Sequence, residues 1–151
     1  MESNVQVVRK GFEDFMKGNT SAVVDICTDD VSWGSYENPG VPMAGTFKGK
    51  EGVREFFSML GELIDYTDFT PREFFEQGNA VVVLGHHAGK VKKTGRTFDH
   101  EWAMLFRLRG PKIYSFFSFT DTRQQAESFH QGFDVERKEA VPASGVRTER
   151  E

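Results

Sequence analysis

Three histidines and one aspartate are the side chains best suited to acid–base chemistry in this sequence. Imidazole titrates near neutral pH, so His86, His87 and His100 can give or take a proton. Asp121 follows a run of phenylalanines, and a carboxyl group beside aromatic walls has its charged form disfavoured, which raises its pKa. These residue types predict cofactor-free proton transfer, with His86, His100 and Asp121 as candidate catalytic residues.

Each candidate also has a structural interpretation. His86 and His87 are adjacent, so in a strand they point to opposite faces and only one can serve a pocket. The hairpin register through Thr94 and Gly95 decides which one does. Asp121 also suits the N-cap of a helix beginning at Thr122, and His100 can simply bond to backbone. The four histidines lack the spacing of a metal site, so no metal is expected.

The strand around His100 indicates which side chains share a face with it. Alternate residues of a strand point the same way, and the more apolar face holds His100, Trp102, Met104, Phe106 and Leu108. We expect this face to line an enclosed pocket beneath the helices.

A loop rich in glycine and proline, residues 34–49, follows a short expected strand at 31–33. Trp33, Tyr36 and Glu37 lie at its start, where they are predicted to form the pocket rim or a lid, and Trp33 is expected to pack in the core as well. Glu37 would act as a base if the loop folds inward. The remaining expected pocket residues are Phe57, Phe117, Ser118 and Phe119.

Helix-like periods come first along the chain and strand-like periods follow. Apolar spacing predicts helices at 3–18, 19–27 and 50–64, whereas β-branched and aromatic residues predict strands at 67–75, 80–91, 97–108 and 113–120. This order is typical of an α+β fold, in which helices cover one face of an antiparallel sheet.

The composition limits the classes of partner. Lys and Arg total 19 against 23 Asp and Glu, for a formal charge of −4, with no basic stripe for nucleic acid. Cys27 is alone, and no apolar run has the length of a membrane span or a secretory signal. We therefore expect a cytoplasmic protein with no membrane association. Residues 1–133 are predicted to form the domain, and the charged segment 134–151, which lacks aromatic residues, a flexible tail.

With these elements in order, the chain resembles the NTF2-like superfamily, specifically its SnoaL-like, ketosteroid-isomerase-related branch. The resemblance rests on the segment 42–49, the helix 51–60, the strand 101–106 and the segment 112–122. It implies a cone-shaped half-barrel, in which three N-terminal helices cover a curved antiparallel sheet around an apolar pocket. It also implies a homodimer formed through the outer face of the sheet.

The catalytic residues of characterised relatives are absent at the corresponding positions. The general base and oxyanion tyrosine of steroid isomerases fall near Ser35 and Gly11, and the last-strand aspartate of related hydrolases and cyclases falls near Ser118. The hydrolase arginine and second aspartate fall near His86 and Ala88, and this comparison favours His86 over His87 as the pocket histidine.

Three functions remain open at the level of sequence. The first is a cofactor-free isomerase, cyclase or hydrolase acting on a small hydrophobic compound. The second is a protein that binds such a compound in the same apolar pocket without turnover. The third is a dimerisation module whose cone is filled by its own phenylalanines.

Overall fold

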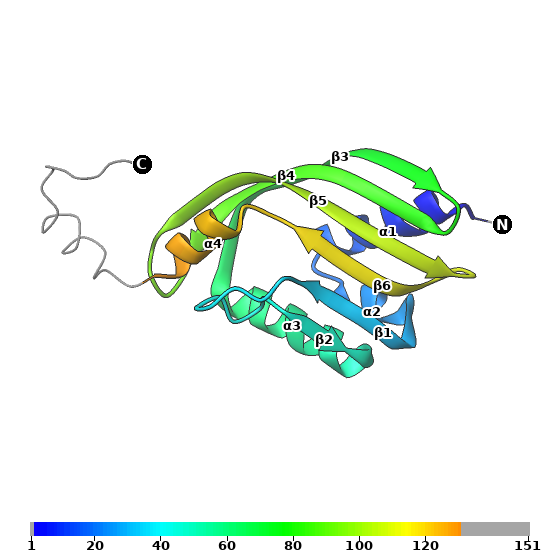
Figure 1. Ribbon diagram of the computed structural model, residues 1–151, viewed down its shortest axis with the longest axis horizontal. Coiled ribbons are helices and arrows are strands. Elements are labelled where there is room, and N and C mark those ends of the chain that lie inside the picture. The colour runs from blue at the N-terminus through cyan, green and yellow to red at the C-terminus, as the bar shows by residue number, and fades with distance from the viewer. Residues whose placement is uncertain (1, 131–151) are drawn as a thin grey trace, which may run out of the picture.

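The computed structural model describes residues 2–130 and has helices first and long strands afterwards, as an α+β fold (Figure 1). The expected tail at 134–151 lies outside these residues. The elements in chain order are α1 (Asn4–Met16), α2 (Thr20–Asp25), β1 (Cys27–Ser35), β2 (Thr46–Lys48), α3 (Gly49–Leu63), β3 (Ile64–Gln77), β4 (Ala80–Val91), β5 (Thr97–Arg109), β6 (Lys112–Phe119) and α4 (Thr122–Phe129).

Side chains at the helix ends explain where the first two helices begin. Ser3 and Gln6 form a reciprocal capping box at the start of α1, and Asn19 accepts a hydrogen bond from the backbone of Ala22 at the start of α2. These bonds satisfy backbone N–H groups that a helix start leaves without partners. Gly18 separates the two helices with a φ of 82°, a conformation that glycine adopts without strain.

The described residues form a sheet of six strands in the order β2-β1-β6-β5-β4-β3. Strands β3 to β6 form the antiparallel meander that the sequence predicts. β1 adds to this meander by pairing with β6 in parallel, and β2 forms the edge. The sheet is strongly curved. It does not close into a barrel, because the two edge strands, β2 and β3, are not paired with each other.

β1 is longer than the expected strand at 31–33. It begins at Cys27, which was expected on the second helix, whereas α2 ends at Asp25. The cause is a long-range pairing, because Cys27 lies opposite Ile113 of β6 and the Ile113 backbone donates to the carbonyl of Ile26 at 2.8 Å. The local pattern of apolar residues around Cys27 cannot reveal a pairing with a strand so distant in the sequence.

The helices cover the concave face of the sheet, and the long strands arch over α1, α2 and α3 (Figure 1). Phe12 of α1 stacks on Trp102 of β5 with ring centroids 5.8 Å apart, and it also contacts Phe106 at 5.7 Å. Aromatic rings therefore join helix and sheet on this inner face. None of the helices within residues 2–130 has both the length and the apolar character needed to cross a bilayer.

Candidate functional site

A cavity of about 130 Å³ lies between the helices and the inner face of the sheet. Its wall is mostly aromatic and aliphatic, and none of the Asp, Glu, Lys or Arg side chains in the described part of the chain lines it. The polar side chains on the wall are those of Ser35, Tyr66, His87, Ser118, Thr120, Gln125 and Ser128. The site is therefore an apolar pocket with a small number of neutral polar groups, a combination common in small-molecule sites.

The face assignment of β5 agrees with the sequence prediction. His100, Trp102, Phe106 and Leu108 are buried on the inner face, and Met104 and Phe106 line the cavity. The indole of Trp102 lies over Gly85 of the neighbouring strand, where any Cβ would overlap with it. Trp102 thus belongs to the core beside the cavity rather than to the cavity wall.

The register of β4 and β5 decides between the two adjacent histidines. His87 lies opposite His100 on the inner face and lines the cavity, whereas His86 lies opposite Glu101 on the outer face. The expectation that His86 is the pocket residue is therefore corrected to His87. The physical reason is the strand alternation itself, which reverses every side chain when the register moves by one residue.

The His87 ring is buried and has no hydrogen-bond partner for either nitrogen among the described residues. It contacts the rings of Tyr66, Phe98 and His100 at centroid distances of 5.6, 5.2 and 4.6 Å. Burial, aided by the neighbouring His100, lowers the pKa of His87 to about 3. The imidazole is therefore neutral at pH 7, with one nitrogen that donates and one that accepts.

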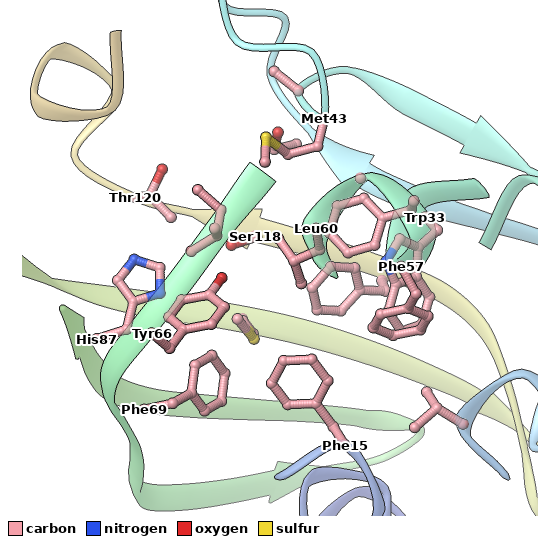
Figure 2. Close-up of a pocket in the computed structure, with 18 of the residues that line it drawn as sticks. Phe15, Trp33, Met43, Phe57, Leu60, Tyr66, Phe69, His87, Ser118 and Thr120 are labelled. Carbon is pink, nitrogen blue, oxygen red and sulfur yellow. The ribbon is translucent and has the colours of Figure 1, made fainter. Parts of the chain in front are cut away.

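Tyr66 reaches the same part of the cavity because β3 is irregular. A bulge between Tyr66 and Asp68 places Tyr66 and Phe69 on the inner face and turns Asp68 outward. The Tyr66 oxygen points into the space beside His87 and Ser118 (Figure 2). Burial raises the pKa of Tyr66 above its ordinary value, so the phenol keeps its proton at neutral pH.

His86 lies on the outer face between two carboxylates. Its Nδ1 is 2.6 Å from Asp68 Oδ2 and its Nε2 is 2.5 Å from Asp99 Oδ1. These hydrogen bonds, the one to Asp68 first, raise the pKa of His86. Among residues 2–130 no three His, Cys, Asp or Glu side chains are placed to hold a metal ion.

The three candidate catalytic residues do not converge on one point. His86 faces outward, and Asp121 is an exposed N-cap whose carboxylate accepts from the Gln124 backbone at 3.0 Å. His100 lies on the inner face against His87 but does not line the cavity, and its Nδ1 lies 3.1 Å from the backbone oxygen of Glu101. Asp121 therefore serves as the N-cap of α4, as its structural interpretation predicted. His100 lies behind the His87 ring and outside the cavity wall.

The remaining expected pocket residues divide by strand face. The cavity wall includes Trp33, Phe57, Met104 and Ser118. Four others lie elsewhere: Glu37 is exposed on the loop, and Tyr36, Phe117 and Phe119 form a ring cluster on the outer face. Phe117 and Phe119 alternate with Ser118, so the same strand that brings Ser118 inward turns them outward.

Tyr66 and Phe69 line the cavity, and the sequence did not identify them as pocket residues. Tyr66 precedes the expected strand at 67–75, and Phe69 lies near its start. Simple alternation from Tyr66 would have turned Asp68 inward and Phe69 outward. The sequence feature that could have indicated this bulge is the pair of glycines Gly85 and Gly89 on the neighbouring strand β4. A Cβ at Gly89 would come within 3.1 Å of the Tyr66 backbone, and such close approaches often accompany bulges.

Comparison with known proteins agrees with this architecture. The model of the SnoaL-like domain matches residues 8–116. An NTF2-like protein from Burkholderia xenovorans LB400 is 29% identical, with 84% of this chain and 95% of that chain covered and a TM-score of 0.76. One from Burkholderia thailandensis E264 is 26% identical, with 86% and 99% covered and a TM-score of 0.78.

A third structure, an NTF2-like protein of unknown function from Burkholderia pseudomallei K96243, is 25% identical, with 85% and 98% covered and a TM-score of 0.76. No curated protein matches the sequence significantly. The family model spans most of the chain, and the solved structures share its curved sheet over nearly their whole length. The chain therefore belongs to the SnoaL-like domain family of the NTF2-like superfamily.

Proposed function

We propose that this protein binds a small, uncharged and largely apolar compound in the cavity, with His87 as a hydrogen-bonding partner. The observation that carries the proposal is the buried His87 ring with two unpartnered nitrogens in an apolar wall. A buried polar group without a partner costs free energy. A ligand oxygen that bonds to His87 would remove that cost.

The methionines offer a direct test of binding. Met43 and Met104 line the cavity, whereas Met16 is half exposed and does not. In protein with isotope-labelled methionine methyl groups, acetophenone is expected to shift the resonances of Met43 and Met104 and to leave Met16 in place. If no resonance moves, or if Met16 moves as much as the other two, the binding proposal fails.

Proton transfer in the same pocket is the second candidate function, and the closeness of His87 and Tyr66 favours it. In this scheme the unprotonated nitrogen of His87 takes a proton from the carbon next to a ligand carbonyl, and the Tyr66 hydroxyl donates to the oxygen that becomes negative. The proton then returns to the same or a neighbouring carbon. The low pKa of His87 makes it a weak base, so binding remains the better supported function.

Hydrogen exchange tests this second function. The methyl protons of acetophenone in D₂O should be replaced by deuterium faster with the protein than without it, and His87→Leu should remove the difference. An exchange rate equal to that of buffer alone would leave binding as the function of the pocket.

We further propose that two copies pair through the outer face of the sheet. Exposed apolar side chains gather there, namely Tyr36, Phe75, Leu84 and Phe119, with exposed fractions of 62, 51, 37 and 43%. Apolar surface of this kind commonly marks a protein interface. Light scattering after gel filtration should give the mass of a dimer for the parent and of a monomer for Leu84→Asp; a monomeric parent would refute the pairing.

The cytoplasmic setting expected from the sequence also stays a proposal. Cell fractionation of the untagged protein is the corresponding measurement, and recovery with membranes or in the medium would contradict it.

A further inference from the structure

We propose that the ligand is a neutral aromatic ketone or alcohol whose oxygen lies among Tyr66, His87 and Ser118 and whose ring lies toward Phe15, Phe57 and Trp33. This inference rests on the proposed function and adds to it the chemical class of the ligand and its orientation. The argument rests on the two opposite ends of the cavity and on a wall that has no charged side chain from residues 2–130.

The first end is a polar corner, defined by Tyr66, His87 and Ser118. These residues come from β3, β4 and β6, and their polar atoms face the same side of the cavity (Figure 2). Both His87 nitrogens are buried without a hydrogen-bond partner, and within residues 2–130 the hydroxyls of Tyr66 and Ser118 make no side-chain hydrogen bond either. The corner supplies hydroxyl donors from Tyr66 and Ser118 and one donor and one acceptor from the neutral imidazole. Such a set fits a carbonyl or hydroxyl oxygen.

The nearby Thr120 differs from this corner, because its hydroxyl lies 3.1 Å from the side-chain oxygen of Gln125 and already has that partner. The hydroxyls of Ser35 and Ser128 likewise donate to backbone carbonyls. At the opposite end of the cavity the buried Trp33 indole N–H has no partner among the described residues.

The second end is aromatic. Phe57 of α3 lies 5.8 Å from Phe15 of α1 and 5.7 Å from Trp33 of β1, measured between ring centroids. These rings lie across the cavity from His87 (Figure 2). Edge and face contacts between rings add to the stabilisation from area burial. An engineered apolar cavity of about 150 Å³ accepts benzene, so the present volume of about 130 Å³ suits a single ring.

The charge of the wall excludes the acid of the same shape. Among residues 2–130 no cationic side chain lines the cavity, and the low pKa of His87 keeps its ring uncharged at pH 7. A carboxylate moved from water into such a wall loses its hydration without gaining a counter-charge. The pocket is therefore selective for neutral oxygen over carboxylate.

Three probes that carry the same phenyl ring separate the contributions of the ring, the neutral oxygen and the negative charge. Acetophenone has a neutral acceptor oxygen, ethylbenzene has none, and benzoate is charged. Their dissociation constants are to be measured by titration of ¹⁵N-labelled protein at pH 7.5, with the parent and with Tyr66→Phe, Ser118→Ala and Tyr114→Phe. Tyr114 is a matched control, because it is a tyrosine on β6 that does not line the cavity. The amide spectrum of each variant reports directly whether it is folded.

The expected result is that acetophenone binds most tightly and benzoate at least about 100-fold more weakly. Tyr66→Phe and Ser118→Ala should each weaken acetophenone by about 2–10-fold, since each removes one neutral hydrogen bond, and should leave ethylbenzene unchanged. Tyr114→Phe should change neither. Benzoate binding as tightly as acetophenone, or acetophenone affinity indifferent to both hydroxyls, would overturn the inference while leaving the pocket a binding site. If none of the probes binds, the proposed function itself fails.

Discussion

Replacing His87 with leucine is predicted to make the ligand-free protein more stable. His87 is 6% exposed, and neither ring nitrogen has a hydrogen-bond partner among the described residues. Leucine has a similar volume and no polar atom, so the substitution removes an unsatisfied buried group without opening a cavity. A gain in stability on removing a polar residue is expected where a binding site lowers the stability of the ligand-free protein.

The size of the effect follows from the desolvation of the ring. An unsatisfied buried polar group costs about 1–3 kcal/mol, so His87→Leu should raise the free energy of unfolding by about that amount at pH 8. For a domain near 150 residues each kcal/mol corresponds to about 2–4 °C in Tm. The variant should therefore melt about 2–12 °C higher.

The stability difference should grow as the pH falls. The pKa of His87 is about 3 in the folded protein and 6.5 in its ordinary state. Between these values the unfolded chain binds a proton that the folded chain does not, so the parent loses stability as the pH drops below 6.5. At pH 5 this adds about 2 kcal/mol to the advantage of the variant, whereas at pH 8 it adds almost nothing.

Urea denaturation of the parent and of His87→Leu at pH 8, 6.5 and 5 measures both the gain in stability and its dependence on pH. His86→Gln is the neighbouring control with the opposite sign. The pKa of His86 is raised by Asp68 and Asp99, so its stabilising contribution is fully present below pH 6.5 and is lost as the pH rises through the folded-state pKa. A His87→Leu variant less stable than the parent, or a difference independent of pH, would refute the placement of His87 as a buried neutral ring.

Two further substitutions test the fold around the site. Gly85→Ala should lower the free energy of unfolding by about 1–3 kcal/mol, because its Cβ would overlap with the Trp102 ring. The control Gly61→Ala has open space at its Cβ and should be neutral or stabilising. Equal urea midpoints for the two variants would contradict this prediction. Asp121→Ala should cost about 1 kcal/mol by removing the N-cap of α4, and Asp121→Asn, which retains a capping oxygen, should leave stability and acetophenone binding unchanged; loss of binding in Asp121→Asn would instead support a role for the carboxylate in the pocket.

The order of elements and the face of β5 were predictable because they depend on local patterns. Alternation along one strand placed Trp102 and Met104 on the same inner face, and side chains of known capping preference marked the starts of α1 and α2. The SnoaL-like family assignment followed from the same order of elements, and the family match confirms it.

The composition of the site was less predictable because it depends on relations between strands. The identity of the pocket histidine rests on the pairing of His87 with His100, which a sequence determines only through turn geometry. The inward position of Tyr66 rests on a bulge in β3. A parallel pairing brought Cys27 to β6, and no local period encodes a partner so distant along the chain.

The imidazole resonances of His87 give the most direct test of a neutral polar group on the wall of a ligand cavity. In ¹⁵N-labelled protein titrated with acetophenone at pH 7.5, the ring nitrogens of His87 should shift with the ligand and show the pattern of an uncharged ring, while those of His86 stay unchanged. An unshifted His87, or a ligand response confined to His86, would contradict the account.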